Sequence, residues 1–155
     1  LYLKRVKLSD AAERVSQDYV EGPGYVKLLR PEGEIDFVAS PNLTAQPFDE
    51  WTLLGRTVKV ETAAEIVAKK LWHRGDRATA RDLFDLSLVI EREPQALVTA
   101  APCLVRHRDA FLTQIQQRRA VLGAQFEAID SLGYRPTYDE AVDRASRFLS
   151  SLSAA

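Results

Sequence analysis

Five basic side chains gather within the stretch KKLWHRGDRATARD, residues 69–82. Two aspartates accompany them, so this stretch has a formal charge of +3, whereas the whole chain has a net charge of −1. Lysine and arginine bind phosphate groups because they combine positive charge with several hydrogen-bond donors. The composition therefore indicates a local site for the phosphates of a nucleotide. The five cations are Lys69, Lys70, Arg74, Arg77 and Arg81.

A helix over residues 78–90 would order the acids that follow. Asp82 and Asp85 would then lie three apart on one face, with Arg81 four residues before Asp85. A turn at the intervening RGD sequence could fold Lys70 back towards Asp82. Such an ammonium and carboxylate pair can bind a phosphate while the acid orients or deprotonates a hydroxyl.

The same pattern has a plainer interpretation. The run RDLFDL can simply join apolar packing to solvated salt bridges, and structural networks of this kind are common. Spacing alone therefore favours a structural role, and the assignment of a site depends on the complete string of residues.

The complete string resembles a known motif. Lys70 followed by leucine, then Arg77, then RDLFDL resembles the third conserved motif of the AbiEii/AbiGii toxin family of nucleotidyltransferases. This family belongs to the DNA polymerase β-like superfamily, whose members transfer a nucleoside monophosphate from a nucleoside triphosphate with metal-bound carboxylates. The resemblance implies two catalytic residues, Lys70 contacting the triphosphate and Asp82 as an essential acid. It also implies that Arg77, Arg81 and Asp85 bind the substrate or hold the helix in place.

A second match lies upstream, in EIDF at residues 34–37. Asp36 stands between apolar residues on a predicted strand, which resembles the place where this superfamily has its third metal carboxylate. The resemblance implies Mg²⁺ as cofactor and Asp36 as a ligand. An aspartate between apolar residues also occurs on many edge strands.

The superfamily's first motif has no counterpart here, because the sequence contains no Gly-Gly, Gly-Ser or Asp-x-Asp. Two metals that bridge a triphosphate need several carboxylates, and Asp36 alone cannot supply them. We therefore expect this chain to be inactive as written. Either the first motif lies in an N-terminal segment that is missing before Leu1, or the chain is a degenerate remnant.

The spacing of apolar residues changes near residue 61, which separates two kinds of predicted element. Before it, short β-leaning runs predict a partial nucleotidyltransferase core over residues 1–60, with a small mixed β-sheet. The predicted elements are a strand at 1–8, a helix from Ser9 or Asp10 to about Tyr19, a β-hairpin at 25–39, a loop at 41–51 and a strand at 56–61.

From Thr62 onward apolar residues recur at intervals of three and four, which predicts a helical region over 61–155 that carries the charged motif. Interruptions are expected near Gly75 and Pro94. Further helices are expected at about 94–101, 107–121 and 137–152, the last with a capping box of Thr137 and Glu140. The fold class is therefore α+β, a small sheet followed by a C-terminal helical bundle.

Composition limits the function classes. Hydrophobic residues make up 46% and charged residues 28% of the 155, as in a soluble globular protein, and no apolar run is long enough to cross a membrane. The single cysteine, Cys103, suits a reducing cytoplasm. No Gly-rich phosphate loop, Gly-x-Ser-x-Gly elbow or zinc-ligand spacing is present, which excludes P-loop enzymes, α/β-hydrolases and zinc proteins.

The resemblance implies a cytoplasmic toxin of a toxin-antitoxin pair. Its substrates would be a nucleoside triphosphate with Mg²⁺ and an acceptor hydroxyl, for which tRNA is one candidate, and its partner a cognate antitoxin. The alternative is a non-catalytic remnant of the same fold that binds a nucleotide or a protein partner. An upstream Gly-Ser turn with an Asp-x-Asp strand in the native gene would favour the enzyme.

Overall fold

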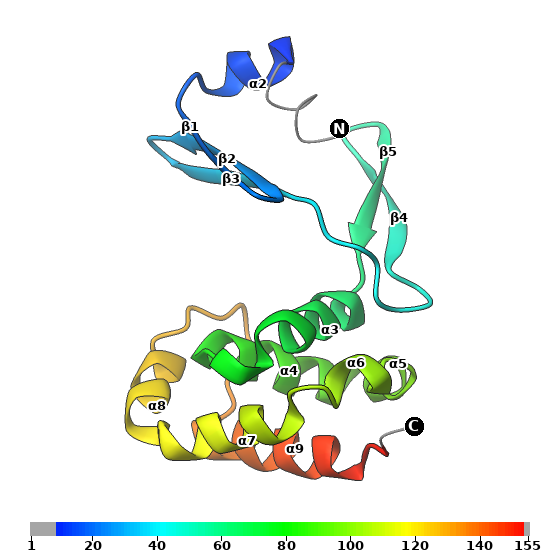
Figure 1. Cartoon of the computed structure of the whole chain (residues 1–155), viewed down its shortest axis with the longest axis vertical. Coiled ribbons are helices and arrows are strands. Elements are labelled where there is room, and N and C mark those ends of the chain that lie inside the picture. Colours follow the sequence, from blue (N-terminus) through cyan, green and yellow to red (C-terminus); the bar gives the residue numbers. More distant parts are fainter. Residues whose placement is uncertain (1–8, 154–155) are drawn as a thin grey trace. The chain divides into compact units, whose positions relative to one another are not determined.

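The computed structural model of the chain describes residues 9–153 (Figure 1). The strand predicted at residues 1–8 lies outside them. The chain divides into two compact units, residues 1–41 and residues 42–155. Within 9–153, no helix is both long enough and apolar enough to cross a membrane.

The first unit contains a short helix and a three-stranded antiparallel sheet of order β1-β2-β3. The predicted helix start is confirmed, since the Ser9 side chain accepts a hydrogen bond from the Ala12 N–H. The helix ends earlier than expected because Ser16 is extended, and the strand β1 that follows was not predicted. The predicted hairpin is confirmed as β2 and β3. The elements are α2 (Asp10–Val15), β1 (Tyr19–Gly22), β2 (Tyr25–Arg30) and β3 (Gly33–Val38).

The second unit begins with an antiparallel pair, β4 (Phe48–Leu53) and β5 (Arg56–Glu61). Leu54 and Gly55 join them with φ of 50° and 74°, the two left-handed conformations of a tight hairpin turn. Strand β5 was predicted, whereas β4 lies partly in the expected loop. The described strands thus form two antiparallel sheets instead of one mixed sheet, and the α+β class is confirmed.

The rest of the second unit is helical, as predicted. The interruptions at Gly75 and Pro94 are confirmed, and so is the capping box of Thr137 and Glu140. The helix expected at 107–121 is divided at Arg118 into two. The elements are α3 (Ala63–Arg74), a 3-10 turn η1 (Gly75–Arg77), α4 (Ala80–Arg92), α5 (Pro94–Thr99), α6 (Ala101–Leu104), α7 (Arg108–Gln117), α8 (Arg119–Glu127) and α9 (Tyr138–Ser151).

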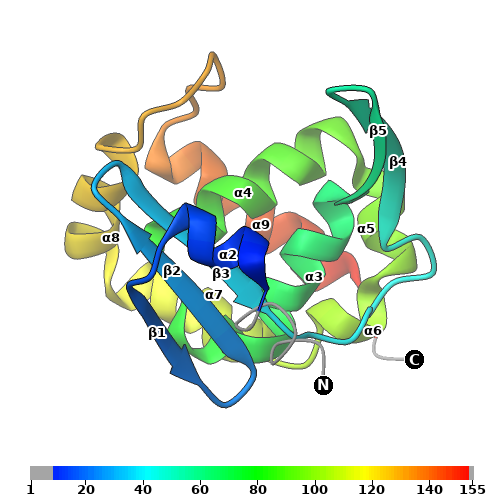
Figure 2. The same ribbon diagram turned by 90° about the horizontal axis from the view of Figure 1, so that it is seen from above.

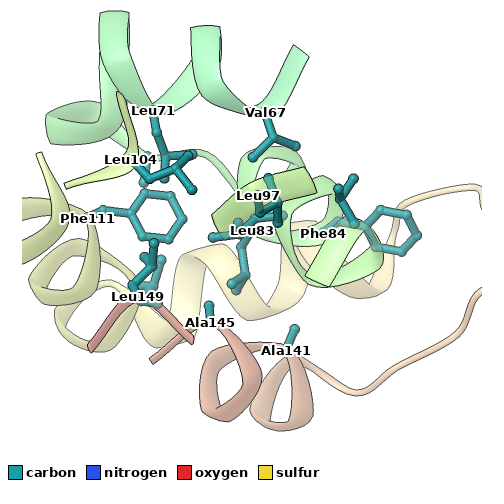
Figure 3. Close-up of a cluster of buried hydrophobic side chains, with 14 of the residues drawn as sticks. Val67, Leu71, Leu83, Phe84, Leu97, Leu104, Phe111, Ala141, Ala145 and Leu149 are labelled. Carbon is teal, nitrogen blue, oxygen red and sulfur yellow. The ribbon is translucent and has the colours of Figure 1, made fainter. Parts of the chain in front are cut away.

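Helix α4 is central to the core of this unit, where it contacts α3, α5, α8 and α9 (Figure 2). Its Leu83 is fully buried and points towards Ala141 and Ala145 of α9, whose small side chains allow the two helices to approach closely (Figure 3). Burying one leucine side chain stabilises the fold by roughly 2–3 kcal/mol. This packing fixes α3 and α4 beside each other and brings charged residues of the two helices into contact.

Candidate functional site

Helices α3 and α4 form a helical hairpin that contains the whole charged motif. The Thr62 side chain caps α3 by accepting from the Glu65 N–H at 3.2 Å. The 3-10 turn at Gly75–Arg77 then reverses the chain. A Cβ at Gly75 would lie 2.8 Å from the His107 Cβ, so the turn needs glycine for α7 to pack against it. We call the line of charged side chains where the two helices meet the α3–α4 seam; it contains Lys70, Arg74, Asp82 and Asp85.

Asp82 is buried at the start of α4, with 2% of its surface exposed. Its Oδ2 accepts from the Thr79 N–H at 3.0 Å and the Thr79 hydroxyl at 2.8 Å, which closes a capping box. Its Oδ1 accepts from Arg74 Nη2 at 2.5 Å. Both carboxylate oxygens are therefore engaged in holding the helix start and an arginine.

Lys70 pairs with Asp85, not with Asp82. The prediction that Lys70 folds back to Asp82 is wrong because Arg74, one helical turn later on the same face of α3, takes that position. The two helices run in opposite directions, so the earlier cation meets the later acid. The Lys70 and Asp85 side chains remain 21% and 26% exposed, so this ion pair is only partly buried.

Arg77 and Arg81 are exposed on either side of the start of α4. Arg77 lies in the 3-10 turn, where its Nη2 donates to the His73 carbonyl at 3.4 Å and its Nε lies 3.5 Å from the Asp76 carboxylate. Arg81 is in the first turn of α4, at the positive end of the helix dipole and next to the Asp82 carboxylate that caps this helix. Both guanidinium groups are therefore exposed near the start of α4 and add positive charge there.

Lys69 has a structural role, although it is adjacent to Lys70 in the sequence. Its Nζ lies 2.5 Å from a Glu61 oxygen and 3.2 Å from Glu65. Burial lowers the pKa of Lys69, but the hydrogen bonds to these two acids outweigh burial and raise the pKa above its ordinary value. Of the two adjacent lysines, Lys70 is the one whose charge is directed to the seam.

Glu65 is a fully buried carboxylate that sequence reasoning did not single out. It accepts from the Leu43 N–H at 3.0 Å, and from the Thr44 N–H at 2.8 Å and hydroxyl at 2.7 Å. Burial raises the pKa of Glu65, but the hydrogen bonds from Thr44, Leu43 and Lys69 bring the pKa below its ordinary value of 4.5. Glu65 therefore anchors the loop before β4 to helix α3.

Asp36, the predicted Mg²⁺ ligand, lies on β3 opposite Lys27 of β2. Its Oδ1 is 3.6 Å from Lys27 Nζ, which also donates to Glu34 at 2.6 Å. Over residues 9–153, no three histidine, cysteine, aspartate or glutamate side chains are grouped so that they could hold a metal ion. The role of Asp36 as a Mg²⁺ ligand stays a prediction.

Comparison with known proteins agrees with the motif. A family model described as the nucleotidyl transferase AbiEii toxin, type IV toxin-antitoxin system, matches residues 9–151, nearly the whole chain. Comparisons with curated proteins and with solved structures gave no match. The match includes both helices of the α3–α4 seam, so it confirms the resemblance found in the sequence. The chain belongs to the AbiEii family of nucleotidyl transferase toxins of type IV toxin-antitoxin systems.

Proposed function

We propose that this chain is the toxin of a type IV pair and binds a nucleoside triphosphate at the α3–α4 seam. The observation that carries this proposal is the partly exposed Lys70 side chain, whose ammonium is held in place by Asp85. Exposed Arg77 and Arg81 add positive charge beside it. A triphosphate is the part of a nucleotide that such a surface recognises.

Lys70 and Asp85 have different roles in this proposal. Asp85 positions the ammonium, and its partial exposure allows Lys70 to contact a phosphate oxygen without leaving the carboxylate. Arg81 then contributes a guanidinium at the positive end of the α4 dipole. Arg77 is a further phosphate ligand from the 3-10 turn.

In nucleotidyl transfer, the acceptor hydroxyl oxygen attacks the α-phosphorus and forms a new oxygen–phosphorus bond. The bond from the α-phosphorus to the α–β bridging oxygen breaks, pyrophosphate leaves with that electron pair, and the hydroxyl proton is lost to a base. Lys70 neutralises the charge that develops on pyrophosphate. The hydrogen bonds of Asp82 favour a positioning role, and direct catalysis by Asp82 stays a prediction.

We propose the acceptor from the charge of the site and the protein partner from the family. An acceptor hydroxyl on RNA, with tRNA as one candidate, suits an enzyme whose motif is basic. A cognate antitoxin is the proposed protein partner, because the family belongs to toxin-antitoxin systems.

A second candidate function is nucleotide binding without transfer. The observation that favours it is the lack of a three-ligand metal group among residues 9–153. In that case the chain retains the phosphate-binding seam but performs no chemistry.

Transfer of label from α-³²P nucleoside triphosphates to cellular RNA, in the presence of Mg²⁺, separates the two functions. An active toxin labels RNA, Lys70→Ala abolishes labelling, and Arg92→Ala leaves it unchanged. Arg92 is a suitable control because it ends α4 ten residues after Asp82, about 15 Å along the helix. Labelling would overturn the expectation that this chain is inactive and would establish the enzyme, whereas nucleotide binding without any labelling would favour the second function.

A further inference from the structure

Two ion pairs cross the α3–α4 seam in register. Lys70 pairs with Asp85, and Arg74 pairs with Asp82. The two cations are four residues apart on α3, a spacing that puts their Cβ atoms about 5–6 Å apart on one helix face. The two acids are three apart on α4. The seam therefore presents two adjacent cations, each held by its own carboxylate.

The ion pair with Asp82 uses only some of the hydrogen-bond donors of Arg74. Its side chain is 44% exposed, whereas Asp82 is 2% exposed. Among the contacts of the described residues, Arg74 uses Nη2 alone, on Asp82 Oδ1. A guanidinium has five N–H donors in a planar fork, so the other donors of Arg74 can bind an oxyanion from the solvent side.

Asp82 is poorly suited to act on a substrate directly. Its Oδ2 is occupied by the Thr79 N–H and hydroxyl, and its Oδ1 by Arg74. Because Asp82 is only 2% exposed, its carboxylate offers a substrate almost no accessible surface, and protonation would weaken its ion pair with Arg74. Asp82 can therefore affect a bound ligand through the guanidinium of Arg74, which it holds in place.

We infer that Arg74 is a second phosphate-binding side chain of the seam and that Asp82 is a positioning residue that acts through Arg74. This inference rests on the proposed function. Lys70 and Arg74 bind neighbouring phosphates of one nucleotide, so the seam selects a polyphosphate over a monophosphate. Arg77 differs from Arg74 because its carboxylate partner, Asp76, is itself half-exposed and lies 3.5 Å away.

Calorimetric titration of the full chain with a nucleoside mono-, di- and triphosphate series tests this inference. Arg74→Ala should weaken triphosphate binding about tenfold or more, the usual effect of losing hydrogen bonds between charged groups. It should change monophosphate binding by less than about threefold, because one phosphate needs one cation. Arg92→Ala, which removes an exposed arginine from the other end of α4, should bind the whole series like wild type.

The outcomes separate this inference from the proposed function. If Arg74→Ala binds triphosphate like wild type while Lys70→Ala does not, Arg74 has no role and the proposed function stands. If Arg74→Ala weakens all three nucleotides equally, the two-phosphate arrangement is wrong. If the wild-type chain binds no nucleotide, the proposed function itself fails and this inference fails with it.

Asp82→Asn tests the positioning role in a double-mutant cycle. If Asp82 acts only through Arg74, adding Asp82→Asn to Arg74→Ala should cause no further loss of triphosphate affinity. An additional loss as large as that seen in the wild-type background would show that Asp82 reaches the nucleotide independently. Thermal unfolding of each variant shows whether it is folded. If Asp82→Asn does not fold, the titrations of Arg74→Ala still test whether Arg74 binds the triphosphate.

Discussion

At the scale of single residues, the two acids of RDLFDL differ in what surrounds them. Asp82 is buried and accepts hydrogen bonds from Thr79 and Arg74, whereas Asp85 is partly exposed and pairs with Lys70. Removing a buried, hydrogen-bonded carboxylate leaves its donors unsatisfied, but an exposed ion pair contributes little. The two positions should therefore respond differently to the same substitution.

We expect Asp82→Ala to lower the free energy of unfolding by roughly 2–4 kcal/mol, from the lost cap and the lost ion pair. Asp85→Ala should lower it by less than about 1 kcal/mol. Urea denaturation of both variants beside wild type measures the difference. Equal losses in the two variants would contradict the assignment of Asp82 as the structural acid.

The sequence identified the residues of the seam but not their pairing. The pattern of Lys70, Asp82 and Asp85 was visible because helical spacing places such residues on predictable faces. Which cation meets which acid depends on where η1 ends and α4 begins, and three residues of 3-10 turn shift this register. Arg74 was seen as a basic residue, but its partner could not be inferred from spacing within either helix.

At the scale of elements, Glu65 connects helix α3 to the loop before β4. The carboxylate accepts hydrogen bonds from Leu43 and Thr44, and its pKa is held below 4.5 despite burial. A carboxyl whose pKa is lower in the folded than in the unfolded state stabilises the fold above the unfolded pKa. This stabilisation is lost as the pH falls through the folded pKa.

We expect Glu65→Gln to lower the free energy of unfolding by roughly 2–3 kcal/mol near neutral pH, because an amide places its NH₂ group against the Leu43 and Thr44 donors. The gap between wild type and variant should narrow as the pH falls from 4.5 towards the lower pKa of Glu65 in the folded state, because the carboxyl of the unfolded chain takes up a proton first. Chemical denaturation across the acid range provides the measurement. A gap that does not change with pH would refute the role of the ionised carboxylate.

Elements with strong periodicity were predictable, whereas the exposed strands β1 and β4 were not. The helices after Thr62 carry apolar residues at helical spacing, and their caps are visible as Thr137 with Glu140. Strand β4 contains FDEWTL, which lacks a regular apolar alternation because most of this strand is exposed. It is a strand because the turn at Leu54 and Gly55 pairs it with β5.

At the scale of the whole molecule, the second unit has its own hydrophobic core. The buried residues of α3 to α9 form one cluster, and Ala12, Val26 and Leu28 of the first unit form another. The α+β class could be predicted from the change of periodicity near residue 61. The contacts group residues 42–61 with the helices, because Leu43 and Pro47 are hydrogen-bonded to the start of α3.

We therefore expect residues 42–155 to fold as a separate fragment. Circular dichroism should show a helical spectrum with a cooperative thermal transition, since a core of this kind supplies the burial that folding needs. The full chain, measured in parallel, provides the reference transition. A fragment without a cooperative transition would show that its core depends on residues 1–41.

The central claim is that the α3–α4 seam binds a nucleoside triphosphate through Lys70. Calorimetric titration of the full chain with each nucleoside triphosphate, with and without Mg²⁺, tests it most directly, beside Lys70→Ala and the control Arg92→Ala. The account predicts that wild type and Arg92→Ala bind at least one triphosphate with the same affinity and that Lys70→Ala binds it about tenfold more weakly or not at all. Equal binding by all three proteins, or no binding by wild type, would contradict it.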